Sequence, residues 1–201
     1  NENTLYTVEA YLSYLDKLAP GGILAITRWL KLPPRDSLKL FATAIEALER
    51  RGVRDPGRRL VLIRSWRTTT LLVRNGEFAA EDLARVRAFL AERSFDAAFL
   101  PDMADGEANR YNVLEQPYLF EGAHALLGPD RDQFLEDYKY DVAPATDDRP
   151  YFFHFLKWRG LAEALSKGGG GLSLVEWGYL VLLAALVQTA AASAVLIILP
   201  L

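Results

Sequence analysis

A Pro-Gly-Gly break at residues 20–22 and the apolar run after it place the strongest constraint on the fold. An amphipathic helical pattern over residues 4–18 precedes the break, and residues 23–29 follow it as an almost continuous apolar run. A short apolar run bounded by turn residues is typical of a strand buried on both faces, as in a parallel sheet. A buried helix is the alternative, but the run is short and paired glycines favour a turn into a strand.

The end of this predicted strand carries the first candidate site. Thr27, Arg28 and Trp29 occupy it, and ligands of open α/β sheets lie outside the carboxyl ends of the strands. We therefore predict that these three residues bind substrate. Arg28 is suited to hold a carboxylate or phosphate through a bidentate contact; the alternative is an arginine that ends a strand and meets solvent.

The remaining pattern predicts a mixed α/β chain. Apolar residues recur at helical spacing over residues 37–48 and 79–93, and two apolar runs interrupted only at residues 66–67 predict an antiparallel hairpin of strands 59–66 and 68–74. Residues 95–100 suit a short edge strand. Residues 102–148 are expected to form a loop-rich cap with short helices at 107–115 and 131–138.

Composition excludes several classes of function. The chain is 51% hydrophobic with a formal net charge of −3, which excludes a disordered chain and gives no sign of nucleic-acid binding. Cysteine is absent, and His124 and His154 are the only histidines. Disulfide scaffolds, thiolate metal sites and cysteine nucleophiles are therefore excluded, and no metal site is expected.

The last part of the sequence predicts a membrane anchor. Residues 156–171 are expected to form an amphipathic segment and a glycine linker, and residues 172–201 are almost entirely apolar. A run of about 20 apolar residues spans a hydrocarbon core, so we predict a transmembrane helix and a lipid bilayer as partner. The preceding basic residues favour a bacterial-type inner membrane with the domain of residues 1–155 on its cytoplasmic side. The chain begins without methionine, and we interpret it as an internal piece of a longer protein.

An acidic pair followed by aromatic residues supplies the second candidate site. Asp147 and Asp148 precede Arg149, Pro150 and Tyr151. Either carboxylate could act as a base or bind a cationic group, and both are weak catalytic candidates; Arg149 and Tyr151 are predicted to bind substrate. In the structural alternative, one carboxylate caps a turn and the other pairs with Arg149.

Two segments together resemble the spermidine synthase family. The pattern at residues 5–24, with its Ala-Pro-Gly-Gly-Ile-Leu ending, is similar to the helix and fifth strand of those aminopropyltransferases. The Thr-Asp-Asp-Arg-Pro stretch at 146–150 is similar to the C-terminal signature of their membrane-attached relatives. The resemblance implies the C-terminal half of a Rossmann-like class I methyltransferase sheet followed by a transmembrane helix. The succession of strand, helix and hairpin agrees with it.

The resemblance also implies a function. It predicts a membrane-anchored transferase that uses S-adenosylmethionine or decarboxylated S-adenosylmethionine, with a small-molecule acceptor such as a polyamine; self-association into a homo-oligomer is left open. The family's glycine-rich nucleotide loop and catalytic aspartate do not occur here, so no residue of this chain is expected to bind the cofactor. The alternative is a non-catalytic degenerate module that scaffolds or regulates a multi-helix membrane protein.

Overall fold

A computed structural model of the chain describes residues 3–157 and 174–195. The chain divides into two compact units, Asn1–Phe155 and Leu156–Leu201.

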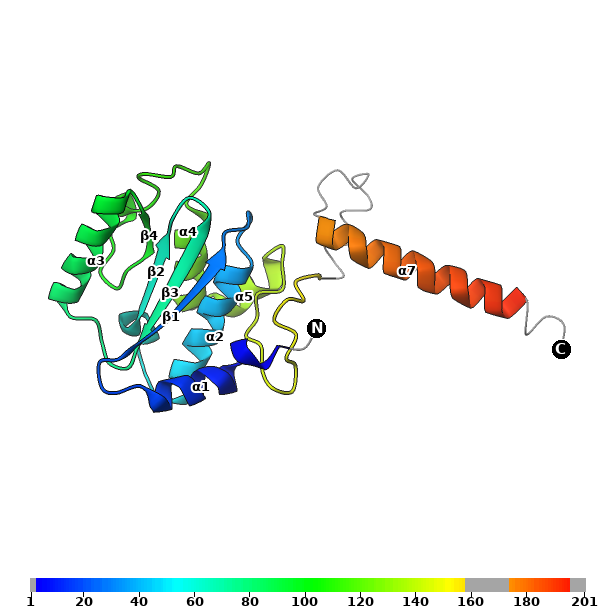
Figure 1. Ribbon diagram of the computed structural model, residues 1–201, viewed down its shortest axis with the longest axis horizontal. Coiled ribbons are helices and arrows are strands. Elements are labelled where there is room, and N and C mark those ends of the chain that lie inside the picture. Colours follow the sequence, from blue (N-terminus) through cyan, green and yellow to red (C-terminus); the bar gives the residue numbers. More distant parts are fainter. Residues whose placement is uncertain (1–2, 158–173, 196–201) are drawn as a thin grey trace. The chain divides into compact units, whose positions relative to one another are not determined.

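The first unit is built on a four-stranded sheet with the strand order β1-β3-β2-β4 (Figure 1). The strands are β1 (Ile23–Trp29), β2 (Leu60–Arg64), β3 (Thr68–Arg74) and β4 (Asp96–Phe99). All three neighbouring pairs are antiparallel. The predicted hairpin of β2 and β3 is confirmed, and so is the position of β4 at an edge of the sheet.

The predicted parallel sheet is wrong. In β1 the exposed residues alternate with half-buried ones, and its ladder is the antiparallel one with β3. Because β1 lies at the edge of the sheet and is covered on one face, its apolar run does not reflect burial on both faces. The described strands form an antiparallel sheet in a mixed α/β unit, so the expected C-terminal half of a Rossmann-like class I methyltransferase sheet is corrected.

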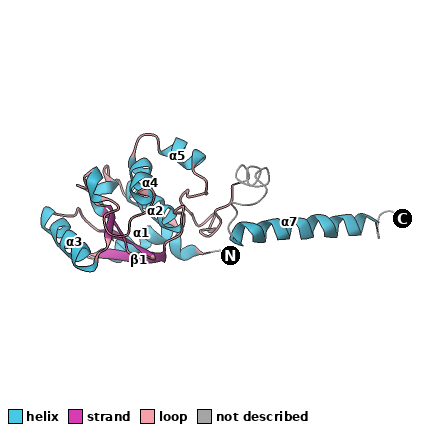
Figure 2. Cartoon of the chain, turned by 90° about the horizontal axis from the view of Figure 1, so that it is seen from above, coloured by secondary structure: helices cyan, strands magenta, loops and turns pink. Residues whose placement is uncertain are grey.

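Helices cover the two faces of this sheet separately. Buried residues of α1 (Val8–Lys17), α2 (Asp36–Arg50) and α4 (Tyr118–Leu127) form the larger core with β2 and β3. Helix α3 (Ala80–Arg93) packs on the other face, where Leu83 and Leu90 meet Val61 and Ile63. Figure 2 shows α3 on the opposite side of the strands from α2 and α4. The sheet is therefore the middle layer of the unit.

The helix boundaries differ from the predictions at three places. The first helix is divided into a 3₁₀ turn, η1 (Thr4–Tyr6), and α1, because Thr7 caps α1. The predicted helix at 107–115 is a loop after η3 (Asp105–Glu107), whereas α4 was not predicted. The helix α5 (Arg131–Asp137) agrees with the prediction, and η2 (Pro56–Arg59) leads into β2.

The second unit contains α7 (Leu174–Ser193). Among the described residues, no helix combines the length and apolar character required to cross a bilayer. Glu176 precedes and Gln188 follows an uninterrupted apolar stretch at 177–187, which is about 16 Å long as a helix against a hydrocarbon core of roughly 30 Å. The predicted transmembrane helix is corrected on this finding, and with it the membrane anchor and the inner-membrane localisation. The predicted glycine linker lies outside the described residues.

Candidate functional site

Hydrogen bonds join the two segments that carry the sequence resemblance. We call residues 145–155 the strap. Its Ala145 carbonyl accepts the Val8 N–H at 2.8 Å, and its Pro150 carbonyl accepts the Asn3 N–H at 2.7 Å. Figure 1 shows the yellow strap beside the blue start of the chain. The strap therefore fixes the beginning of α1.

Asp147 belongs to this attachment. Its Oδ1 accepts a 2.7 Å hydrogen bond from the hydroxyl of Thr7, which is fully buried. The same hydroxyl accepts the N–H of Ala10 as the N-cap of α1. The N–H of Asp147 donates to Glu9 Oε2 at 3.0 Å. Burial alone would raise the pKa of Glu9, but hydrogen bonds from backbone N–H groups and from Arg50 lower it.

Asp148, Arg149 and Tyr151 lie on the exposed side of the strap. Asp148 and Arg149 occupy a turn that the Arg149 N–H closes on the Thr146 carbonyl at 2.9 Å. Tyr151 is 50% exposed. The ion pairs of the described residues include none between Asp148 and Arg149. Both members of the acidic pair are exposed, and Asp147 is the one that the Thr7 hydroxyl holds.

Thr7 gives a direct test of the strap attachment. Replacing Thr7 by valine removes the cap of α1 and leaves Asp147 without its hydroxyl donor, so we expect the free energy of unfolding to fall by about 1–3 kcal/mol. Thr4→Val is the matched control, because the Thr4 side chain is exposed. Urea unfolding followed by circular dichroism measures both. Equal stability of the two variants would contradict this role of Thr7.

The predicted trio at the end of β1 does not converge. Successive side chains of a strand point to opposite faces. Arg28 is on the face covered by α2, whereas the Thr27 hydroxyl is hydrogen-bonded to the Thr70 hydroxyl at 2.9 Å on the other face, which is exposed at β1. Trp29 is 62% exposed on that same face, with the Arg67 guanidinium 5.8 Å from its ring centroid. Of the three, only Arg28 reaches the strap.

The Arg28 guanidinium contacts two aromatic rings, one from the beginning of the first unit and one from its end. Its guanidinium carbon is 5.5 Å from the ring centroid of Tyr6 and 5.0 Å from that of Phe153. Its Nη2 is 3.3 Å from Asp36 Oδ2, in the first turn of α2. Cation–π contacts of this kind hold a guanidinium while leaving its edge available for hydrogen bonds.

Two further cations lie at the start of α2, beyond Arg28 of β1. Arg35, the N-cap residue, lies 5.2 Å from the ring centroid of Tyr140 and 5.1 Å from that of Phe155. Lys39 donates to the carbonyl oxygens of Asp141 at 3.3 Å and His154 at 3.1 Å. We call Arg28, Arg35, Asp36 and Lys39 the cation cluster.

The cation cluster is mostly buried. Arg35 and Asp36 are each 8% exposed and Lys39 is 3% exposed. Burial lowers the pKa of Lys39, and the negative charges of Asp141 and Asp36 partly oppose that shift. Buried charges at this density mark candidate functional sites. Arg35, Asp36 and Lys39 were not predicted as site residues from the sequence. The available signal was charge within an otherwise apolar helix face, together with the aromatic run of the strap.

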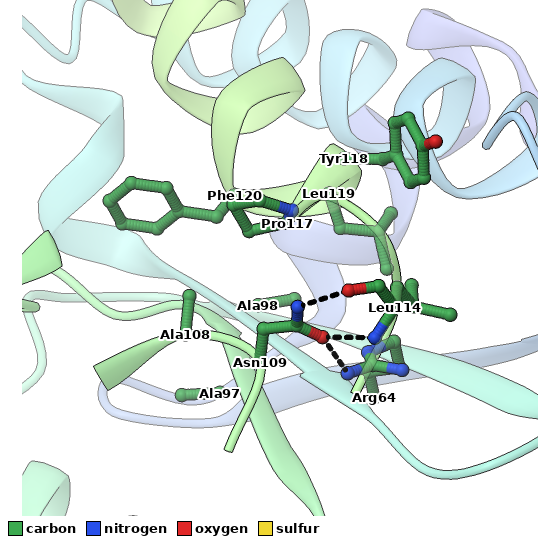
Figure 3. Close-up of a pocket in the computed structure, with 10 residues that line it drawn as sticks. All are labelled: Arg64, Ala97, Ala98, Ala108, Asn109, Leu114, Pro117, Tyr118, Leu119 and Phe120. Atoms are coloured by element: carbon green, nitrogen blue, oxygen red, sulfur yellow. Dashed lines mark hydrogen bonds between the residues drawn. The ribbon is translucent and has the colours of Figure 1, made fainter. Parts of the chain in front are cut away.

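A small pocket lies elsewhere in the first unit. It has a volume of about 10 Å³ and lies between β2, β4 and the start of α4, which is room for about one water molecule. Figure 3 shows that Asn109 lines this pocket. Its side-chain amide donates to the Leu114 carbonyl oxygen and accepts from the Leu114 N–H, both at 2.7 Å, and it also accepts from Arg64 at 3.2 Å. This hydrogen-bonding pattern gives the pocket a structural role.

Two larger cavities also lie away from the predicted site residues. One of about 190 Å³ lies between α3 and the loop around Glu107, and one of about 220 Å³ lies beside Arg131 and Phe99. Neither cavity is lined by the strap or by the cation cluster. In the described part of the chain, no group of three acidic or histidine side chains is arranged to hold a metal ion.

Comparison with known proteins gives no family for the chain. No protein-family model matches it, and neither the curated proteins nor the solved structures include a significant match.

Proposed function

We propose that the chain is the acceptor-binding part of a spermidine synthase-like transferase that uses S-adenosylmethionine or its decarboxylated form. One observation supports this most strongly. The two segments that carry the resemblance are separated by 140 residues in sequence, yet Thr7 and Asp147 join them through a 2.7 Å hydrogen bond. This hydrogen bond brings the two segments that carry the resemblance next to each other.

The proposal assigns distinct roles to residues around the strap. When bound, the donor supplies an electrophilic carbon next to a sulfonium. The residues of this chain would hold the acceptor so that its nucleophilic atom faces that carbon, which is an effect of positioning. As the new bond to carbon forms and the carbon–sulfur bond breaks, a proton leaves the acceptor. Asp148 is the carboxylate we assign to take that proton, because Asp147 is occupied by Thr7.

The donor site belongs outside this chain in the proposal. The sequence has no glycine-rich turn between a strand and a helix that could hold a nucleotide. We therefore expect the 201-residue chain alone to show no turnover. A radiolabelled-donor assay with amine and acid acceptors measures this, and turnover by the isolated chain would contradict the assignment.

Donor binding by the longest natural protein that contains the chain tests the function. Calorimetry with S-adenosylmethionine and with its decarboxylated form is expected to show binding of one donor, and the preferred donor would identify the transferred group. Asp148→Asn should then lower kcat by about 10²–10⁴-fold and leave donor binding unchanged. Asp147→Asn is the matched control, expected to lower stability more than kcat. A folded protein that binds neither donor would contradict the proposal.

A second candidate is a non-catalytic module that scaffolds or regulates another protein. The observation in its favour is that Asp147, half of the acidic pair, serves the attachment of the strap. The same calorimetry separates the two functions, because only a transferase requires a donor.

A further inference from the structure

Two arginines of the cation cluster share one carboxylate. Asp36 pairs with Arg28 at 3.3 Å and with Arg35 at 3.7 Å, and both distances are long for charge-assisted hydrogen bonds. Among the ion pairs of the described residues, neither arginine has another carboxylate. The site therefore contains more positive charge than its own acid can balance.

Each arginine also has a buried donor without an acceptor. The Nε atoms of Arg28 and Arg35 are buried and have no hydrogen-bond partner in the described part of the chain. The whole Arg35 residue is only 8% exposed. Buried N–H groups are almost always paired in native proteins, so two such donors on arginines that share one carboxylate indicate a missing acceptor.

The surrounding structure favours an anion as that acceptor. Arg35 is the N-cap of the 15-residue helix α2 and makes no side-chain capping bond, so the positive end of the helix dipole faces the same place. Rings of Tyr6 and Phe153 hold the Arg28 guanidinium in position. The Arg28 side chain remains 24% exposed, which gives a ligand access.

We propose that Arg28 and Arg35 form a binding site for an anionic group, a carboxylate or a phosphate, on the acceptor substrate. An oxyanion with two or three oxygens matches the planar donor edge of a guanidinium and supplies acceptors for both Nε–H groups. A polycationic amine does not fit here, because like charges repel. The identification of the anion as part of an acceptor rests on the proposed transferase function; the anion site itself rests on the arginines alone.

Nuclear magnetic resonance of the arginine side chains tests the site without any assay of activity. The chain labelled with ¹⁵N-arginine is titrated with inorganic phosphate, with acetate and with putrescine at constant ionic strength. We expect a saturable shift of the Arg28 and Arg35 Nε–H signals with an anion and none with putrescine. Comparing the titration with phosphate and the titration with acetate shows whether the site prefers a phosphate or a carboxylate. Absence of a saturable shift with either anion would overturn the proposal.

Matched variants separate this site from general charge effects. Arg28→Gln and Arg35→Gln should each weaken anion binding about tenfold or more. Arg93→Gln should leave it unchanged, although Arg93 also combines a ring contact with Phe89 and an ion pair with Glu92. Arg28→Lys keeps the charge but loses the planar donor edge, so it should bind with intermediate affinity. Unchanged affinity in folded Arg28→Lys and Arg35→Gln would overturn the proposal even if Arg28→Gln does not fold.

The outcome is independent of donor binding. If phosphate or acetate binds but the longer protein binds no donor, the transferase proposal fails and the anion site stands. If a donor binds but neither anion shifts the arginine signals, the transferase proposal stands and the anion site fails.

Discussion

Replacing Asp96 by alanine is expected to lower the free energy of unfolding by about 3–5 kcal/mol, because it leaves a buried guanidinium and several N–H groups without their acceptor. The Asp96 side chain is 0% exposed and accepts from Arg64 Nη2 at 2.9 Å. It also accepts the backbone N–H groups of Arg110, Tyr111 and Asn112 at 2.6, 2.8 and 2.9 Å. One carboxylate therefore holds β2, β4 and the following loop together.

Denaturant unfolding followed by circular dichroism measures this effect. Asp102→Ala is the control, since Asp102 pairs with Arg87 but its side chain is 52% exposed; exposed pairs contribute about 0–1 kcal/mol. Similar losses in the two variants would contradict the structural role of Asp96.

The Asp96 contribution should also depend on pH. Burial alone would raise the pKa of Asp96, but the N–H groups of Tyr111 and Asn112, the Asn112 amide and Arg64 lower it below its ordinary value. A carboxyl group with a lower pKa in the folded state stabilises fully above its unfolded pKa of about 3.9 and loses this effect as the pH falls through the folded pKa. The stability difference between the wild type and Asp96→Ala should therefore shrink below about pH 4. A constant difference down to pH 2 would contradict this.

Replacing Phe152 by alanine is expected to cost about 3–5 kcal/mol, the usual effect of removing a large buried ring. Phe152 is fully buried and lies 4.9 Å from Tyr6 and 5.1 Å from Phe153 between ring centroids. Its loss leaves a cavity under the strap, so the contacts of the strap with the start of α1 should weaken as well. Arg28 depends on Tyr6 and Phe153 for its position, and anion binding should weaken with them.

Tyr151→Ala provides the control next to it in the chain. Tyr151 is 50% exposed, and surface substitutions usually change stability by less than about 0.5 kcal/mol. Hydrogen exchange of the Val8 amide, which the Ala145 carbonyl accepts at 2.8 Å, reports on the strap directly. Unchanged Val8 protection in Phe152→Ala would contradict the link between the ring and the strap.

Local patterns in the sequence predicted most elements because they depend on nearby residues. The period of α3 and the short connection between β2 and β3, residues 65–67, determine those elements without the rest of the chain. The environment of β1 is different, since its apolar run fits a central strand or an edge strand equally well. Which of these it is depends on neighbours far away in sequence, so the pattern alone led to the wrong sheet.

The same limit applies to the site. Adjacent residues Thr27 and Arg28 were grouped by sequence, yet the pleat of β1 separates them onto opposite faces. Arg28 instead meets Phe153, which lies on the strap near the other end of the unit. Lys39 was not identified because its acceptors are backbone carbonyls of Asp141 and His154, and carbonyl acceptors leave no mark in a sequence.

The strap also has a consequence for the order in which the protein is made. Thr7 precedes its partner Asp147 by 140 residues, so at about 5–20 residues per second a ribosome synthesises Asp147 on the order of 10 s later. Until then the Thr7 hydroxyl lacks its Asp147 acceptor, and Arg28 lacks the ring of Phe153. The attachment of the first helix to the strap is therefore made last, and a stop codon before the strap would release a chain without it.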